Sequence, residues 1–275
     1  MGVKPHVIMF LDILGYKNMI TSVTDENDYL GSVHTLMSLL SKYIETYNQG
    51  VDEKTKHRLN LSRFKSMIFS DNILFFAPYD SEIDMLNLAN NLIYGLSQFL
   101  FQYTKSTIFF RGAITAGQLF YDEKLHFVFG TGLVRAYELE SNVAIYPRIV
   151  IDTCLKPSPI LVGWAQDEDG IWYADYLTLG YALLCNPHNG ETPIPHDDFL
   201  SYIVSHKNGI CSALEKYKTN DRVYIKYRWL ASYYVKAKLF CPEIAGLFCR
   251  IAGLFCHDSR ANLSLKPVCF GIAIS

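Results

Sequence analysis

The feature that most constrains this chain is an apolar run near its N-terminus that closes on an aspartate. Residues 7–11 (VIMFL) contain no polar position, which predicts a buried strand. Asp12 follows at once, and Gly15 comes three residues later. A carboxylate at the tip of a buried strand is costly unless a positive charge lies beside it. The run therefore predicts a buried strand whose end is a charged site.

The rest of the pattern alternates helices and strands. Helical periodicity covers residues 29–47, 83–101 and 130–140, and further strands are expected at 64–69, 72–77, 107–120, 126–129 and 147–151. Ser70-Asp71 joins two of these strands as a hairpin. This order predicts an α+β fold: one sheet with helices on one side, built as a ferredoxin-like βαββαβ core over about residues 5–153.

A C-terminal hairpin and helical region is expected to pack on this core. Residues 154–275 hold a hairpin in GIWYADYL (170–177) and helical patterns at about 199–217 and 221–240. The longest apolar segment, 244–256, is shorter than the roughly 20 residues that a membrane span needs. No signal peptide is recognised at the N-terminus.

Composition narrows the class of protein. Of 275 residues, 50% are hydrophobic and 19% are charged, which is typical of a globular protein with a full core. The net charge of −2 favours neither a nucleic-acid partner nor a membrane surface. Seven cysteines without a C-x-x-C pair indicate reduced core cysteines, so a cytoplasmic location is expected.

Two aspartates are expected to meet at one edge of the sheet. Asp12 ends the first strand, and Asp71 lies at the turn of the neighbouring hairpin. Paired carboxylates suit a hard cation such as Mg²⁺ or Mn²⁺, with phosphate oxygens and water completing its ligands. The alternative is that each aspartate only caps a turn.

Four motifs in order extend this hypothesis. They are the strand F-x-D-I-x-G-[FY] (Phe10, Asp12, Ile13, Gly15, Tyr16), the hairpin Ser70-Asp71, the strand RGAITAG (111–117) and the helix GTGLVRAYELE (130–140). Over about residues 7–152 this series resembles the class III nucleotidyl cyclases. Among them it is most similar to the bacterial pyrimidine cyclases of the Pycsar anti-phage systems.

The resemblance implies a reaction and an assembly. It implies two divalent cations, Mn²⁺ or Mg²⁺, held by the side chains of Asp12 and Asp71 and the carbonyl of Ile13. The ribose 3′-hydroxyl of a nucleoside triphosphate would attack the α-phosphorus, and pyrophosphate would leave. It also implies a homodimer with sites shared between subunits, and a cyclic product that acts on a separate effector protein.

Departures from the purine cyclases point to a pyrimidine substrate. Met67 stands where those enzymes carry a base-reading lysine, and Thr131 replaces the partner acid. Lys65 lies two residues before Met67, on the same face of the strand. A lysine at the 4-position of the base would favour the acceptor oxygen of uracil, so UTP is the expected substrate and CTP is the alternative.

The usual transition-state arginine is also missing. Val134 and Glu138 occupy the positions of the Asn and Arg that purine cyclases carry. Arg111 and Arg135 are the candidates to replace that charge, and either can instead be a structural arginine. A non-catalytic nucleotide-binding sensor of the same fold therefore remains a second hypothesis. A diguanylate cyclase is disfavoured, because the G-G-[DE]-E-F hairpin is absent.

Overall fold

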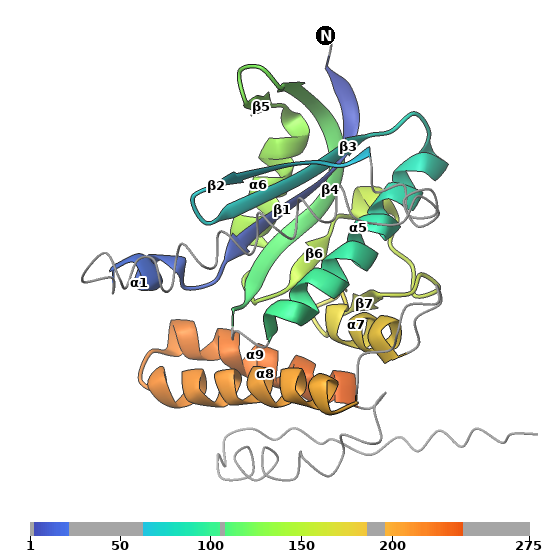
Figure 1. Cartoon of the computed structure of the whole chain (residues 1–275). Coiled ribbons are helices and arrows are strands. Elements are labelled where there is room, and N and C mark those ends of the chain that lie inside the picture. The colour runs from blue at the N-terminus through green and yellow to red at the C-terminus, as the bar shows by residue number, and fades with distance from the viewer. Residues whose placement is uncertain (1–2, 22–62, 105–107, 186–195, 239–275) are drawn as a thin grey trace, which may run out of the picture. The chain divides into compact units, whose positions relative to one another are not determined.

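The computed structural model describes residues 3–21, 63–104, 108–185 and 196–238 (Figure 1). The strands are β1 (Lys4–Ile13), β2 (Lys65–Phe69), β3 (Asn72–Pro78), β4 (Phe110–Asp122), β5 (Phe127–Phe129), β6 (Ile149–Ile151), β7 (Trp164–Gln166) and β8 (Trp172–Ala174). The helices are α1 (Tyr16–Thr21), α5 (Glu82–Thr104), α6 (Thr131–Asn142), the 3₁₀ turn η3 (Thr153–Leu155), α7 (Tyr176–Cys185), α8 (His196–Lys216) and α9 (Asp221–Lys238). The helix expected at 29–47 and the apolar segment 244–256 lie outside the described residues.

The strands form one sheet in the order β2-β3-β1-β4-β6-β8-β7, with β5 paired to β4. Strand β1 pairs antiparallel with β3 on one edge and with β4 on the other. The order β2-β3-β1-β4 is that of a ferredoxin-like sheet. The expected α+β fold is therefore confirmed. The division at residue 153 into a core and an extension stays a prediction.

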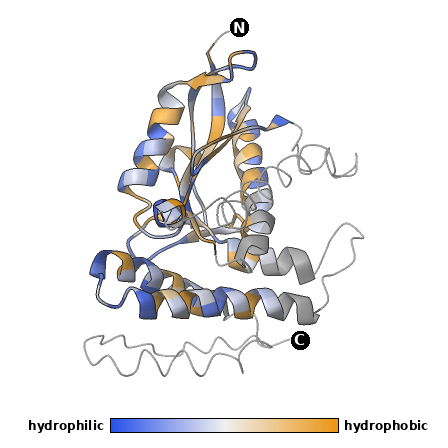
Figure 2. Ribbon diagram, turned by 60° about the vertical axis from the view of Figure 1, so that its left-hand side comes forward, coloured by the Kyte–Doolittle hydropathy of each residue, from blue (hydrophilic) through white to orange (hydrophobic). Residues whose placement is uncertain are grey.

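Helices cover both faces of the sheet, so the expectation of helices on one side is wrong. Figures 1 and 2 show the sheet lying between α5 and α6. On the α6 side, Ile8 and Phe10 pack with Leu74, Phe76 and Ala136. The physical reason is the lack of alternation in β1: a strand that is apolar on both faces needs a layer on each.

Helix α6 approaches β4 backbone to backbone at one point. A Cβ atom added at Gly117 would come within 2.6 Å of the Cα of Gly132, which belongs to the first turn of α6. Glycine at both positions therefore allows backbone to approach backbone. This contact fixes the position of the N-terminal end of α6 along β4.

The region after β6 contains one α-helix that the sequence pattern misses, besides the short 3₁₀ turn η3. GIWYADYL contributes β8 to the expected hairpin, but its last residues already belong to α7. Asp175 explains the change, because its carboxylate accepts the N–H of Thr178 and so caps the first turn. Helices α8 and α9 agree with the expected helical patterns. Cys154 and Cys211 are free thiols, but Cys154 is exposed and does not belong to the core.

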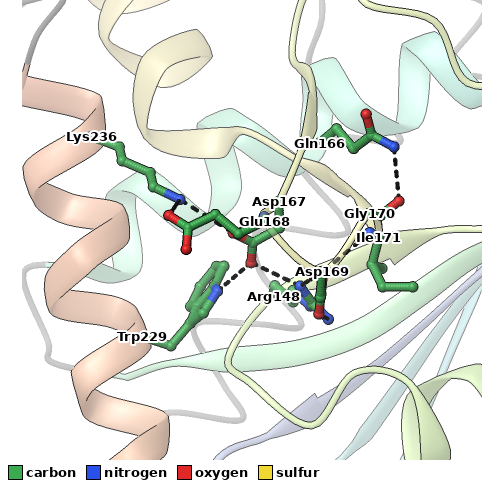
Figure 3. A network of polar contacts seen from close by, with 9 residues as sticks. All are labelled: Arg148, Gln166, Asp167, Glu168, Asp169, Gly170, Ile171, Trp229 and Lys236. Atoms are coloured by element: carbon green, nitrogen blue, oxygen red, sulfur yellow. Dashed lines mark hydrogen bonds and ion pairs between the residues drawn. The ribbon is translucent and has the colours of Figure 1, made fainter. Parts of the chain in front are cut away.

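A buried ionic network joins α9 to the sheet (Figure 3). The side chain of Arg148, only 2% exposed, lies 2.8 Å from the carboxylate of Asp167 and 2.5 Å from that of Asp169. From α9, the indole of Trp229 donates to Asp167 at 2.5 Å, and Lys236 lies 3.2 Å from the same carboxylate. The network thus links the start of β6, the β7–β8 turn and α9.

We expect Arg148→Met to lower the free energy of unfolding by about 3 kcal/mol, because it removes one partner of a buried ion pair. Urea denaturation measures the change. The control Lys218→Met removes an exposed ion pair with Glu215 and should cost less than about 1 kcal/mol. Equal losses for the two variants would contradict a structural role for the network.

Candidate metal and nucleotide site

The two predicted aspartates meet where β1 ends. Asp12 lies between Asn72 of β3 and Arg111 of β4 in the strand register. Asp71 occupies the β2–β3 turn, and its carbonyl accepts the N–H of Ile13 at 3.1 Å. The hairpin thus brings the two aspartates side by side, as the sequence predicts. Their role as metal ligands stays a prediction.

Arg111 connects Asp12 to a third carboxylate, that of Glu140. The guanidinium Nε of Arg111 donates to Asp12 Oδ2 at 2.7 Å, and its Nη2 lies 2.6 Å from Glu140 Oε1. The second contact is an ion pair without the alignment of a hydrogen bond. Glu140 comes from the C-terminal half of α6, and its side chain is only 4% exposed. The sequence reasoning missed this residue, although it closes the fourth motif.

The electrostatics of this cluster favour an added cation. Burial raises the pKa of Asp12 to about 6, and the negative charges of Glu140 and Asp71 act in the same direction. The hydrogen bond and charge of Arg111 oppose the rise without cancelling it. Two carboxylates thus contact the guanidinium of Arg111, and the charge of Asp71 acts on Asp12 as well. A metal ion bound beside Asp12 would relieve this imbalance.

The donor set fits a hard divalent cation. Asp12, Asp71 and the carbonyl of Ile13 offer only oxygen atoms, which Mg²⁺ and Mn²⁺ prefer. Across the part of the chain that the structure describes, no group of three or more His, Cys, Asp or Glu side chains could hold a metal by itself. The remaining ligands would therefore have to be phosphate oxygens and water.

The predicted base-reading residues lie toward the other end of the same face. Lys65 forms an ion pair with Glu123 at 2.9 Å, and its ammonium lies over the ring of Tyr121. Thr131 is exposed and adjoins Gly117. Since Gly117 lies six residues beyond Arg111, about 20 Å of extended strand separates Thr131 from Asp12. Lys65 lies level with Ile8 in the register, four residues or about 13 Å of strand before Asp12. One chain therefore does not bring Lys65 and Thr131 together with Asp12.

Met67 is a partly buried core residue. It pairs in register with Leu74 and packs against the cluster that includes Phe10. Because directly opposed residues of antiparallel strands share a face, Met67 lies on the same face of the sheet as Asp12. It thus lies between the aspartate end of that face and Lys65.

Arg135 does not reach the aspartates either. It donates two hydrogen bonds of 2.9 Å to Asp152, which also accepts the hydroxyl of Thr115 at 2.6 Å. Thr115 lies four residues beyond Arg111 on β4, which is about 13 Å of strand. Of the two candidate arginines, only Arg111 lies beside Asp12.

Comparisons with known proteins give a distant likeness. No protein-family model and no curated protein matches the chain. Similar solved structures include the adenylyl cyclase CyaB from P. aeruginosa, which is 14% identical with a TM-score of 0.38 over 63% of this chain and 94% of that one. A bacterial light-regulated adenylyl cyclase is 13% identical, with a TM-score of 0.38 over 66% of this chain and 98% of that one. The guanylyl cyclase Cya2 is 14% identical, with a TM-score of 0.36 over 63% of this chain and 93% of that one. Within the described residues, no helix is long and apolar enough to cross a membrane.

The raised pKa of Asp12 predicts a pH-dependent stability. The folded state binds this proton more tightly than the unfolded state does, so the stabilisation is present below pH 4 and is lost as the pH rises through about 6. For a rise of this size we expect a loss of about 2–3 kcal/mol between pH 4 and pH 7 in metal-free wild-type protein.

Urea denaturation at a series of pH values tests this loss. Asp12→Asn should remove this part of the pH dependence, whereas the control Asp80→Asn, at an exposed position, should keep it. A pH profile of Asp12→Asn that matches wild type would contradict the electrostatic description of the cluster.

Proposed function

We propose that this chain is a nucleotidyl cyclase that converts UTP to 3′,5′-cyclic UMP and pyrophosphate. The observation that carries the proposal is the meeting of Asp12 and Asp71 at the end of β1, beside Arg111. The order of the four sequence motifs supports the same reading. The cyclic product would then act on a separate effector in anti-phage defence, as the resemblance to the Pycsar cyclases implies.

The site would hold two divalent cations, Mn²⁺ or Mg²⁺, through Asp12, Asp71 and the carbonyl of Ile13. When bound, these cations would neutralise the triphosphate and lower the pKa of the ribose 3′-hydroxyl. Among the protein's own groups, Arg111 holds one oxygen of Asp12, and Glu140 holds the far end of Arg111. This chain of contacts fixes the orientation of the Asp12 carboxylate before a ligand arrives.

The chemical step asks for little covalent work from the protein. The 3′-oxygen attacks the α-phosphorus in line, its proton passes to water, and the bond to the pyrophosphate oxygen breaks. The protein must place the nucleotide and neutralise the charge that develops. We assign to Arg111 the placement of Asp12, because its guanidinium already contacts two carboxylates.

The preference for a pyrimidine rests on Lys65, Met67 and Thr131. The partly buried Met67 leaves no charged group at the position of the purine reader. The ammonium of Lys65 lies at the surface, beside Glu123, where it could exchange this partner for a base edge. Cyclic CMP from CTP remains the alternative product.

A two-fold homodimer would complete the site. The Asp12 end and the Thr131 end of the α6 face lie too far apart in one chain, and a head-to-tail pair would place each end opposite its counterpart. Exposed apolar side chains on this face support such a contact: Phe69 is 40% exposed, and Val134 and Tyr137 are 58% exposed. Phe69 and Tyr137 both contact Phe10, two residues before Asp12.

An equimolar mixture of the four nucleoside triphosphates with Mn²⁺ tests the reaction. Wild-type protein should yield mainly cyclic UMP on chromatography, and Asp71→Ala should reduce turnover at least about 1,000-fold by removing a metal ligand. The control Asp80→Ala, at an exposed position, should keep full activity. Cyclic AMP or GMP as main product would refute pyrimidine selectivity, and cyclic CMP would refute the role given to Lys65. No product from any triphosphate would favour the non-catalytic sensor.

Mixing inactive variants tests the shared site. Asp71→Ala affects the metal end, and Thr131→Trp blocks the far end. In an equal mixture, half of the dimers are mixed and each has one intact site, so about a quarter of wild-type activity should return. A mixture that stays inactive, although native mass spectrometry shows mixed dimers, would contradict sites shared between subunits.

A further inference from the structure

Helix α9 lies against the end of the sheet that carries the aspartates. Its Tyr227 packs edge-on against Phe109, with ring centroids 5.8 Å apart, and both rings are buried. Phe109 precedes Arg111 by two residues, and its carbonyl accepts the N–H of Leu14 at 2.9 Å, just after β1 ends. The contact therefore places the middle of α9 beside the segments that position Asp12 and Arg111.

Further contacts fix α9 along its length. The indole of Trp229 stacks on Tyr146, with an interplanar angle of 4°, and donates to Asp167 (Figure 3). One turn later, the hydroxyl of Tyr233 donates to Asp175 at 2.8 Å and accepts the N–H of Leu177 at 2.9 Å. Side chains of α9 that precede Trp229 thus have a defined position relative to the site.

Lys226 directly precedes Tyr227 on α9, near enough to this charged cluster for their charges to interact. The side chain is half-buried, and its charge interacts with those of Asp12, Glu140 and Arg111. Burial lowers its pKa, and the cations Arg111 and Arg222 add to that effect, while Asp12 and Glu140 oppose it. Among the residues that the structure describes, none forms a hydrogen bond or an ion pair with its ammonium group.

Arg111 and Lys226, the two cations near Asp12, therefore differ in their anionic partners. Arg111 is engaged by two carboxylates, whereas the half-buried Lys226 ammonium has no direct anionic partner among the residues that the structure describes. Partial burial of an unpaired charge costs free energy, and such groups gather at ligand sites. An anion bound beside Asp12 and Asp71 would give Lys226 the missing partner. Lysine suits phosphate in this way, as a point charge.

We propose that Lys226 binds the phosphate chain of the nucleotide at the Asp12–Asp71 end of the sheet, within the same chain. The identity of the nucleotide rests on the proposed function, but the phosphate contact does not. On this inference α9 belongs to the binding site and is more than a support for the core.

Binding of inorganic tripolyphosphate in the presence of Mg²⁺ tests this proposal directly. Isothermal titration calorimetry on the full chain should give a dissociation constant at least about tenfold weaker for Lys226→Met, which loses one charge contact to phosphate. Lys226→Arg keeps the charge and should stay within threefold of wild type. The matched control Lys4→Met, at the exposed start of β1, should bind as wild type does. Equal affinities for wild type and Lys226→Met, or no binding by wild type, would overturn the proposal.

A second measurement needs no variant and so does not depend on folding of the mutants. Tripolyphosphate should slow reductive methylation of Lys226 in wild-type protein at least tenfold by mass spectrometry, while Lys4 reacts at an unchanged rate. Unprotected Lys226 would overturn the proposal. Turnover is scored separately: phosphate binding through Lys226 without any cyclic product would refute the cyclase and leave the phosphate site intact.

Discussion

The pairing of β1 along both edges is the constraint on which the rest of the structure depends. Its register places Asp12 between Asn72 and Arg111, and so within reach of Glu140. A slip of one residue would turn the Asp12 side chain to the opposite face of the sheet, away from α6. The apolar residues of β1 oppose such a slip, because both faces of the strand are buried. The same register thus serves both the packing of the sheet and the geometry of the site.

Local signals in the sequence predicted this part of the molecule well. The run at 7–11 indicated the buried strand, and Ser70-Asp71 indicated the hairpin that brings Asp71 to Asp12. These features depend on neighbours in the chain, for which periodicity and turn residues carry information. The covering of both faces was missed, although an apolar run without alternation is itself typical of a strand that is buried on both faces. Helix α7 was missed because aromatic residues at 172–177 are compatible with a strand as well as with a helix.

Long-range contacts account for most of what the sequence did not reveal. Lys226 lies 214 positions after Asp12, and nothing in its local pattern distinguishes it from a solvated lysine on a helix. Its placement depends on the packing of Tyr227 on Phe109. Arg135 was predicted to lie in the site but binds Asp152 instead. The cause is similar, because β6, which pairs with β4, positions the carboxylate of Asp152. Candidate residue types can be read from a motif, but their partners depend on tertiary packing.

The close approach of Gly117 and Gly132 fixes where the two ends of α6 lie along β4. With backbone against backbone, α6 has no room to slide along β4. Thr131 and Glu140, near its two ends, are nine residues apart, a separation of about 14 Å at the rise of an α-helix. The helix is thereby a spacer of fixed length. A ligand or partner that touches both ends must match a distance set by the helical rise, and cannot adjust it.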